Sequence, residues 1–321
     1  MANNLLSIND LSKQEILDLI DFANNFIDED GDFRKENLFP DKIVANVFCE
    51  PSTRTKSSFT IAANNLGCSV IDFDVDNSSV QKGESIFETV DALNLMGVDL
   101  CVLRHPESVI RELADFLPRM VFVNAGEGSL SHPTQALLDI KTIMDHKKTV
   151  DGLNIVIVGD IDHSRVASSF VEGLTNFDLG SLIFSGHPEM CTKYQNPIIG
   201  KYEPNLDKAL EDADVIMTLR IQHERFDKEL NLDLDTYKSQ YQLSLEKLGN
   251  AKGDAIVMHP GPVNYVEITE SVYDSDNSVI RQQVANGVSV RMAVLSLSLI
   301  HISEPTRPER IGDCGVGVEK K

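Results

Sequence analysis

Positive charge is scarce in this chain. Its 321 residues include 29 lysines and arginines against 50 aspartates and glutamates, which gives a formal net charge of −21. Nucleic-acid binding depends on Lys and Arg side chains that neutralise phosphates, and the sequence has no basic stripe of this kind. We therefore expect no nucleic-acid partner, and any local cluster of cations needs its own explanation.

Long apolar runs and paired cysteines are missing as well. No stretch of about 18 apolar residues occurs, and the first residues, MANNLLSIND, lack the basic and apolar segments of a signal peptide. The five cysteines are scattered and never form a C-x-x-C pair, which argues against a disulfide framework or a structural zinc site. We expect a cytoplasmic protein that binds neither membrane nor metal.

The chain alternates apolar runs of strand length with segments of helical period. Alternation of this kind predicts an α/β fold in which helices cover both faces of parallel sheets. The predicted strands span 43–48, 68–75, 98–104, 121–125, 154–159, 181–185, 214–219 and 255–259, and the predicted helices span 12–27, 54–66, 84–96, 133–146, 164–175, 206–213 and 280–295.

A polar stretch at 145–152 divides this alternation into two blocks. We predict two doubly wound parallel-sheet domains, residues 1–147 and 148–296, with the active site in the cleft between them. Ligands of such sheets bind beyond the carboxyl ends of the strands, beside the N-termini of the following helices. Residues 297–321 resemble a translated sequencing adapter, so we treat them as a non-native tail and exclude them from the fold.

The segment EPSTRTKSSF, which starts at Glu50, follows one predicted strand and leads directly into a helix. Hydroxyl groups and a guanidinium at a helix N-terminus form a phosphate site together with the free backbone N–H groups. A capping serine followed by solvated polar side chains would have the same local pattern. One motif alone does not separate the two interpretations.

Residues at other strand ends favour the phosphate site. Arg104 ends the third predicted strand, and His132 and Gln135 open the helix after the fourth. Strand ends of one parallel sheet gather along one edge, so these side chains can meet above the same anion. His132 by itself fits a capping or packing role better than a catalytic one. Together the residues predict a site for a ligand that carries a phosphate and a carbonyl group.

Five motifs occur in a characteristic order and spacing: EPSTRTKSSF, HPTQALLDI, GDIDHSRVASSF, LRIQHERF and MHPGPVN. With them, roughly residues 1–296 resemble the aspartate carbamoyltransferase catalytic chains of the aspartate/ornithine carbamoyltransferase family. The resemblance implies transfer of a carbamoyl group from carbamoyl phosphate to the amine of L-aspartate, which yields N-carbamoyl-L-aspartate and phosphate for pyrimidine biosynthesis. It implies no metal and no organic cofactor.

The same resemblance implies which residues bind each substrate. Carbamoyl phosphate is expected to contact Ser52, Thr53, Arg54, Thr55, Arg104, His132 and Gln135, with Thr55, Arg104 and His132 donating catalytic hydrogen bonds to the carbamoyl oxygen. L-Aspartate is expected to contact Arg165, Arg220 and Gln222, together with Gly261 and Pro262 of the MHPGPVN loop. Without the resemblance, either arginine could be a solvated surface side chain.

The loop at 78–84 is, by itself, only polar and glycine-containing. In the family its serine and lysine enter the site of a neighbouring subunit, so the resemblance assigns Ser78 to carbamoyl phosphate and Lys82 to both substrates. It therefore implies a homotrimer with shared active sites. Relatives occur alone or with regulatory or dihydroorotase chains, and the sequence does not choose between these assemblies.

Two positions depart from the family pattern. Lys56 stands at the fifth position of the S-T-R-T-R motif, where it keeps the charge but loses the bidentate fork of arginine. After Arg165 the chain reads V-A-S-S-F, where many relatives have a further arginine and an asparagine. An auxiliary contact is therefore in question at each position.

Other functions fit parts of the pattern. Ornithine carbamoyltransferases share the phosphate site, but they have H-C-L-P where this chain has H-P-G-P at 259–262, and they need an acidic partner for a cationic acceptor. A non-catalytic phosphometabolite-binding module is a further alternative, although the complete set of substrate arginines speaks against it. A dinucleotide dehydrogenase would require spaced glycines, which the stretch from Gly159 to Arg165 lacks.

Overall fold

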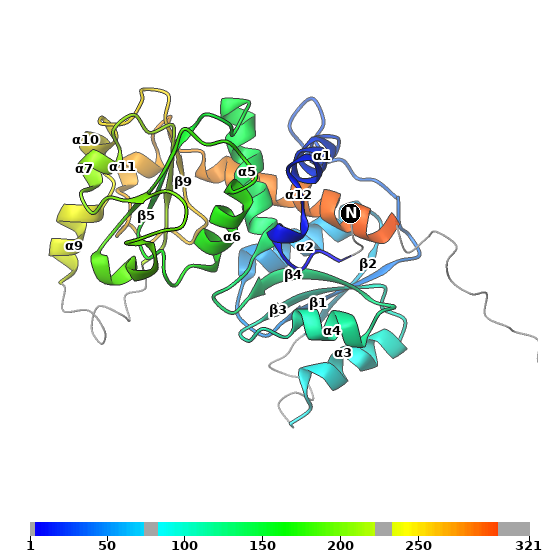
Figure 1. Ribbon diagram of the computed structural model, residues 1–321. Helices are drawn as coiled ribbons and strands as arrows, with labels where there is room; N and C mark the ends of the chain where they lie inside the picture. The colour runs from blue at the N-terminus through cyan, green and yellow to red at the C-terminus, as the bar shows by residue number, and fades with distance from the viewer. Residues whose placement is uncertain (1–3, 74–82, 222–232, 301–321) are drawn as a thin grey trace, which may run out of the picture.

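The computed structural model describes residues 4–73, 83–221 and 233–300 of the chain. These residues form two parallel sheets with helices on both faces, so the predicted α/β class and doubly wound architecture are confirmed (Figure 1). The first sheet has the order β2 (Ser69–Phe73), β1 (Ile43–Phe48), β3 (Leu100–His105), β4 (Val121–Glu127), and the second has the order β7 (Lys201–Tyr202), β6 (Ser181–Ser185), β5 (Asn154–Val158), β8 (Val215–Thr218), β9 (Ile256–Met258).

The strands form where apolar and β-branched runs can be buried on two sides. β4 and β8 are buried at every position, and β1 and β5 are buried at all but their first residue. Strands covered on both faces of a parallel sheet are typically continuous apolar runs of this kind, and β4 is one of them although it lies at an edge of its sheet. β2 lies at the edge of the first sheet and is exposed or half-buried along its length.

Helices cover both faces of each sheet. On the first sheet, one face carries α1 (Lys13–Asn24), α2 (Thr53–Asn65) and α12 (Ile280–Ile300), and the other carries α3 (Ile86–Leu95) and α4 (Ile110–Phe116). On the second sheet, one face carries α5 (Pro133–Lys147) and α6 (Arg165–Leu174), and the other carries α7 (Leu206–Ala209), α10 (Leu245–Leu248) and α11 (Glu270–Tyr273). Further elements are α9 (Leu234–Tyr241) and the short 3-10 helices η1 (Ile8–Asp10), η4 (Pro188–Met190) and η5 (Thr192–Tyr194).

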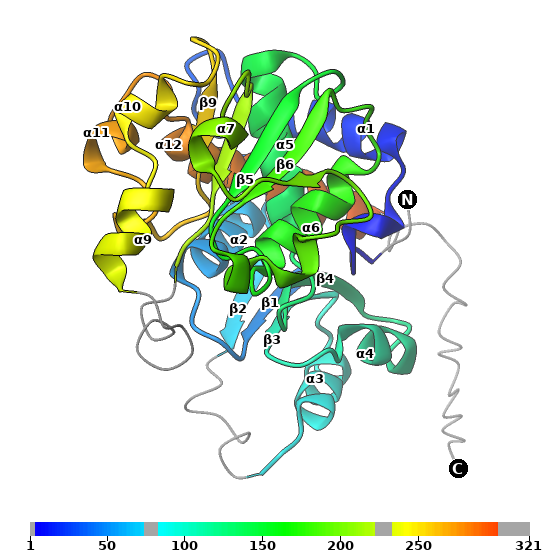
Figure 2. The same ribbon diagram turned by 60° about the vertical axis from the view of Figure 1, so that its left-hand side comes forward.

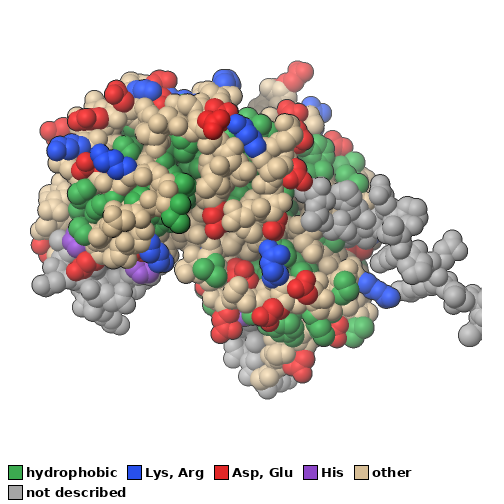
Figure 3. Space-filling model, in the orientation of Figure 1, with side chains coloured by type: hydrophobic (Ala, Val, Ile, Leu, Met, Phe, Trp, Pro, Cys, Tyr) green, Lys and Arg blue, Asp and Glu red, His purple; other side chains and the backbone are tan. Residues whose placement is uncertain are grey.

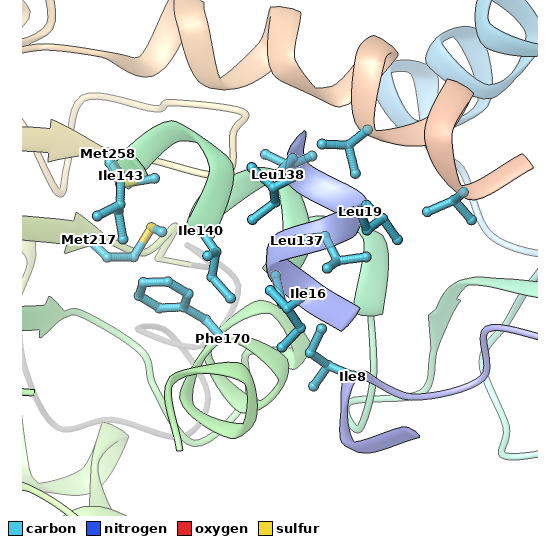
Figure 4. Packing of buried hydrophobic residues seen from close by; sticks show 14 of the residues in the cluster. Ile8, Ile16, Leu19, Leu137, Leu138, Ile140, Ile143, Phe170, Met217 and Met258 are labelled. Atoms are coloured by element: carbon cyan, nitrogen blue, oxygen red, sulfur yellow. The ribbon is translucent and has the colours of Figure 1, made fainter. Parts of the chain in front are cut away.

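One apolar core joins the two sheets. Leu137 of α5 lies beside Leu19 of α1, and Ile140 of the same helix lies near Phe170 of α6 and Met217 of β8 (Figure 4). α12 runs from the second half back to the first, where it packs against α1, α2 and α5 (Figures 1 and 2). Burial of these shared surfaces therefore fixes the two halves relative to each other.

Among the helices of the described residues, α12 alone is long and apolar enough to cross a membrane by length and composition. A core helix that is apolar all round passes the same test. In this fold, 78% of the most apolar window of α12 is buried against other elements. Its packing is that of a core helix.

Several elements were not predicted from the sequence, namely β7, α4, α9, α10 and α11. For α4, no local side chain in the described chain caps the start, and the backbone N–H of Ile110 instead donates to Glu127 Oε1 at 2.8 Å. Such a distant partner leaves no local pattern. The predicted end of the last helix at 295 was wrong, because α12 continues to Ile300 and buries Leu299 completely. Residues 297–300 of the predicted non-native tail are thus helical, and 301–321 lie outside the described residues.

Candidate active site

Both sheets reverse their strand order beside one cavity. The reversals lie between β1 and β3 in the first sheet and between β5 and β8 in the second. The loops that leave these strands line a cavity of about 700 Å³. Open α/β sheets bind ligands in crevices of this kind, outside the carboxyl ends of the strands. In the space-filling view a notch separates the two halves, and Lys, Arg and His side chains lie beside it (Figure 3).

The cavity brings together most of the predicted site. Its lining includes Ser52, Thr53, Arg54, Thr55, Arg104, His132, Gln135, Arg165, Arg220, Gly261 and Pro262. Ser78, Lys82 and Gln222 lie outside the described residues, so the structure does not place them. What each residue binds stays a prediction, but residues from both halves of the chain do meet.

Two uncapped helix N-termini open at this cavity. Ser52 occupies the N-cap position of α2, yet its side chain makes no capping hydrogen bond among the described residues. Its hydroxyl instead accepts a hydrogen bond from Arg104 Nη1 at 3.3 Å. α5 likewise begins at His132 without a side-chain cap in the described chain. The start of α2 therefore presents free N–H groups and partial positive charge to a ligand, which favours the phosphate interpretation over the capping one. At the start of α5, Pro133 has no N–H and the N–H of Gln135 donates to the carbonyl of His132, so that end contributes mainly its partial charge.

Several arginines share the cavity and disturb one another. Burial, followed by the charge of Arg165, lowers the pKa of Arg104 to about 10. Burial and the charge of Arg220 likewise lower the pKa of Arg54. A chain with net charge −21 that gathers guanidinium groups despite their repulsion is built to hold anionic ligands there.

Glu50 belongs to the site, although the sequence analysis assigned it no role. Its Oε2 lies 3.3 Å from Arg104 Nε and 2.9 Å from Arg165 Nη2. The negative charge opposes the fall in the pKa of Arg104. The sequence places Glu50 two residues before Ser52, which suggests that it lies near the site. A single acidic residue in a loop, however, does not indicate which arginines it will pair with.

Gly126 allows two of the arginines to approach the backbone closely. Its φ is +128°, and a Cβ atom there would lie 3.2 Å from Arg104 Nη1 and 3.3 Å from Arg165 Nη1. Gly261, with φ +69°, makes similar room for Arg54, whose Cζ would lie 3.1 Å from a Cβ. Both positions favour glycine for its backbone and for its size. The motif pointed to Gly261, whereas no local pattern distinguishes Gly126.

His132 is buried beside these cations and is 3% exposed. Burial, reinforced by the charges of Arg291, Arg104 and Arg165, holds its pKa well below the usual value, so the ring is neutral at pH 7. Its Nδ1 is buried without a hydrogen-bond partner among the described residues. The backbone N–H of His132 donates to Ser169 Oγ at 2.8 Å. Ser169 lies in the divergent V-A-S-S-F stretch, which therefore positions a site residue.

Other reactive side chains near the site are less suited to chemistry. Within the described ranges, no group of three His, Cys, Asp or Glu side chains is placed to hold a metal ion. Burial and the charge of Glu50 raise the pKa of the Cys49 thiol to about 11. Since the thiolate is the nucleophilic form, Cys49 is not poised as a nucleophile.

Comparison with known proteins gives matches along almost the whole chain. The family profile of the aspartate/ornithine carbamoyltransferase carbamoyl-P binding domain matches residues 3–145, and that of the Asp/Orn binding domain matches residues 151–298. The aspartate carbamoyltransferase catalytic subunit of Coxiella burnetii (strain Dugway 5J108-111) is 43% identical over 303 residues, which cover 92% of this chain and 96% of the relative. That of Carboxydothermus hydrogenoformans is 42% identical over 297 residues, covering 92% and 95%.

Solved structures agree with the sequence matches. The catalytic subunit of M. Jannaschii aspartate transcarbamoylase is similar with a TM-score of 0.80 and 34% identity, covering 94% of this chain and 99% of that one. Aspartate transcarbamoylase from Trypanosoma cruzi, in complex with carbamoyl phosphate and aspartate, has a TM-score of 0.79 at 29% identity, covering 92% and 96%. With both family domains matched in order and the site residues gathered in one cavity, the chain belongs to the aspartate/ornithine carbamoyltransferase family.

Proposed function

We propose that the cavity transfers the carbamoyl group of carbamoyl phosphate to the amine of L-aspartate, giving N-carbamoyl-L-aspartate and phosphate. The observation that carries this proposal is the meeting of Arg54, Arg104, Arg165 and Arg220 around one cavity. One substrate is a phosphate dianion and the other carries two carboxylates, so both must be neutralised at once. The similar enzyme from Trypanosoma cruzi has been solved with carbamoyl phosphate and aspartate, and with N-(phosphonacetyl)-L-aspartic acid.

The phosphate group would bind at the start of α2. Ser52, Thr53 and Arg54 supply hydroxyl and guanidinium donors beside the free N–H groups of the helix. The Ser52 hydroxyl accepts a hydrogen bond from the Arg104 guanidinium, so the two side chains are held side by side. The donors therefore need little rearrangement when the phosphate arrives.

The carbamoyl oxygen would be bound by Thr55, Arg104 and His132. The uncharged amine of aspartate attacks the carbamoyl carbon, a C–N bond forms and negative charge grows on the oxygen. The bond to phosphate then breaks, and the leaving phosphate takes the proton that the amine loses. Donors fixed around that oxygen stabilise the transition state more than the ground state. A neutral His132 can donate one ring N–H to the oxygen, and the lowered pKa keeps it in this form.

Aspartate would bind on the side of the second sheet. Arg165 begins α6 after β5, and Arg220 follows β8, so the two arginines flank the strand reversal of that sheet. Each guanidinium fork suits one carboxylate. Gly261 and Pro262, after β9, would direct backbone carbonyls at the amine. Holding two mutually repelling anions in reacting geometry can be worth about 7–11 kcal/mol.

The deciding experiment offers aspartate and ornithine separately with carbamoyl phosphate. We expect carbamoyl aspartate from the first mixture and no carbamoylated product from the second. Product from ornithine alone would assign the chain to the ornithine branch of the family. Calorimetric binding of carbamoyl phosphate without product at saturating substrates would instead favour the non-catalytic phosphometabolite-binding module.

We also propose a homotrimer in which Ser78 and Lys82 complete the site of a neighbouring subunit. The family resemblance supports this assembly, as do the exposed apolar side chains of Ile71, Leu95 and Met96 in the first half. Lys82→Ala and Arg54→Ala variants, each inactive alone, should regain activity when dissociated and mixed, because some sites then receive neither substitution. A monomer in light scattering, or no recovery on mixing, would refute sharing. The relatives are named catalytic subunits, which supports an assembly with other chains, and regulatory or dihydroorotase chains are the two kinds that we propose.

A further inference from the structure

A buried chain of hydrogen bonds runs behind the cavity from α5 through α12 to the loop after β9. Asp139 is fully buried on α5, and its Oδ1 accepts hydrogen bonds from Gln135 Nε2 at 3.0 Å and from Gln283 Nε2 at 2.6 Å. Gln283, on α12, accepts through Oε1 from the backbone N–H of His259 at 2.9 Å. Gln135, Gln283 and His259 also line the cavity.

The hydrogen-bond partners of Gln135 and Gln283 determine which way each side-chain amide faces. A backbone N–H can only donate, so the amide oxygen of Gln283 faces His259 and its NH2 group faces Asp139. Asp139 Oδ1 accepts in both contacts, so the NH2 group of Gln135 faces Asp139 as well. The amide oxygen of Gln135 is thereby left to face the cavity that this residue lines.

The same series of hydrogen bonds fixes the loop after β9. The Nδ1 atom of His259 accepts a hydrogen bond from the backbone N–H of Gly261 at 2.7 Å. The ring proton is therefore on Nε2, which lies 2.7 Å from Glu267 Oε1 and donates to it. Gln283 binds the backbone N–H of His259, and the ring of His259 binds the backbone N–H of Gly261. These two contacts position the loop after β9 relative to α12.

The donors around Asp139 favour the charged form of its carboxylate, whereas burial opposes that form. Burial raises the pKa of Asp139 to about 7, while the hydrogen bonds from Gln283 and Gln135 and the charge of Arg291 oppose that rise. The two amides thus stabilise the charged form that orients them. The amides and Asp139 Oδ1 are connected in one preferred arrangement, while Asp139 Oδ2 is buried without a hydrogen-bond partner among the described residues.

We propose that Asp139 and Gln283 are positioning residues that select the carbamoyl group of the donor by keeping the amide oxygen of Gln135 turned toward its NH2 group. This inference rests on the proposed function, in which Gln135 contacts carbamoyl phosphate. Acetyl phosphate has the same shape but carries a methyl group instead of the NH2 group. It would leave the fixed amide oxygen without a donor, which is how a built hydrogen-bonding site rejects an analogue.

The test compares dissociation constants of carbamoyl phosphate and acetyl phosphate, measured by calorimetry on the intact protein. Asp139→Leu frees the Gln135 amide to rotate, and Gln283→Met removes both amide bonds at nearly constant length. We expect the preference for carbamoyl phosphate to fall about tenfold in each, as for the loss of one hydrogen bond. Asp139→Asn keeps an acceptor oxygen and should recover most of the preference.

Asn286→Leu is the matched control. Asn286 lies about one turn further along α12 and also bridges to α5, through Thr142 Oγ1 and Asp145 Oδ2, both at 2.9 Å. The Asn286→Leu variant should keep the same preference for carbamoyl phosphate over acetyl phosphate as wild type. An equal loss in Asn286→Leu, or an unchanged preference in folded Asp139→Leu and Gln283→Met, would overturn the inference. The test measures binding, so its result is valid even if the protein forms no carbamoyl aspartate. Absence of that product would refute only the proposed function.

Discussion

The carboxylate of Glu50 lies 2.9 Å from the guanidinium of Arg165, so an acid that follows β1 in the first sheet holds the arginine that begins α6 beside the second. The same carboxylate lies 3.3 Å from Arg104. It therefore screens the repulsion between two cations and orients the fork of one of them. The site depends on this contact between the halves of the molecule.

Replacing Glu50 by Gln should weaken the binding of aspartate. Arg165 then loses its charged partner and the mutual repulsion with Arg104 grows. We expect the KM for aspartate to rise about tenfold, which corresponds to about 1.4 kcal/mol. Asp274→Asn is the control, since it removes the exposed ion pair with Arg281 and should leave the KM unchanged. An unaltered aspartate KM in Glu50→Gln would mean that Arg165 is oriented by other contacts.

Replacing His132 by Ala should slow turnover more than it weakens binding. The loss of one donor to a developing oxyanion typically lowers kcat by about 10²–10³. His105→Ala is the control, because the ring contacts of His105 in the described chain are local ones, with the backbone N–H and carbonyl of Glu107 two residues further on. Steady-state kinetics of both variants check this result, and a fall in carbamoyl phosphate affinity with kcat intact would assign His132 to binding alone.

The pH dependence of the wild-type rate gives a separate test of His132. Its pKa is held well below the usual value by burial and by three arginines, so the neutral ring should persist as the pH falls from 8 to 6. We therefore expect that protonation of His132 does not lower kcat between pH 8 and pH 6. A decline near pH 6.5 that disappears in His132→Asn would show that the ring is charged more easily than its surroundings suggest.

The residues that line the cavity could be predicted because their positions follow from local order. A strand, a loop with hydroxyls and a helix start occur within a few residues of Ser52, and parallel strands must bring such ends to one edge. Glu50, Gly126 and Ser169 could not be predicted in the same way. Their roles arise from contacts with side chains or backbone far away in the chain, for instance that of Ser169 with the N–H of His132.

Element ends show the same division between local and distant causes. α1 begins at a capping box formed by Ser12 and Glu15, so its start could be predicted. α4 begins where Glu127 binds its first N–H, and α12 continues to Ile300 because α1 and α2 bury its last turns. Packing of this kind overrides local propensity.

Gly126→Ala should reduce both stability and substrate binding. The backbone at φ +128° is strained with a side chain, and the new Cβ would crowd Arg104 and Arg165 at 3.2 and 3.3 Å. Gly97→Ala separates the two effects, because its φ is +96° but no described atom lies within 4 Å of the position that its new Cβ would take. We expect both variants to lose about 1–3 kcal/mol of stability and only Gly126→Ala to raise the KM for both substrates. Equal substrate KM values in the two variants would contradict a steric role for Gly126.

Asp139 offers a test in which charge burial and hydrogen bonding oppose each other. Its pKa in the folded protein is raised to about 7, whereas an unfolded aspartate titrates near pH 4. Between these values the folded protein holds a proton that the unfolded chain releases, so the free energy of unfolding falls as the pH rises through this window. Asparagine has no charge to bury. Asp139→Asn should therefore melt at a higher temperature than wild type at pH 8, with a difference that shrinks toward pH 5.

Asp151→Asn should melt at a lower temperature than wild type, which is opposite to the change expected for Asp139→Asn. Hydrogen bonds from Lys13 and from the backbone of Asp178 lower the pKa of Asp151, so its charge stabilises the fold above about pH 4 and this contribution is lost as the pH falls further. Melting curves from pH 5 to 8 decide between the two behaviours. An Asp139→Asn variant less stable than wild type at pH 8 would mean that the bonds from Gln135 and Gln283 outweigh the cost of burying the charge, and that this network stabilises the fold as well as orienting the site.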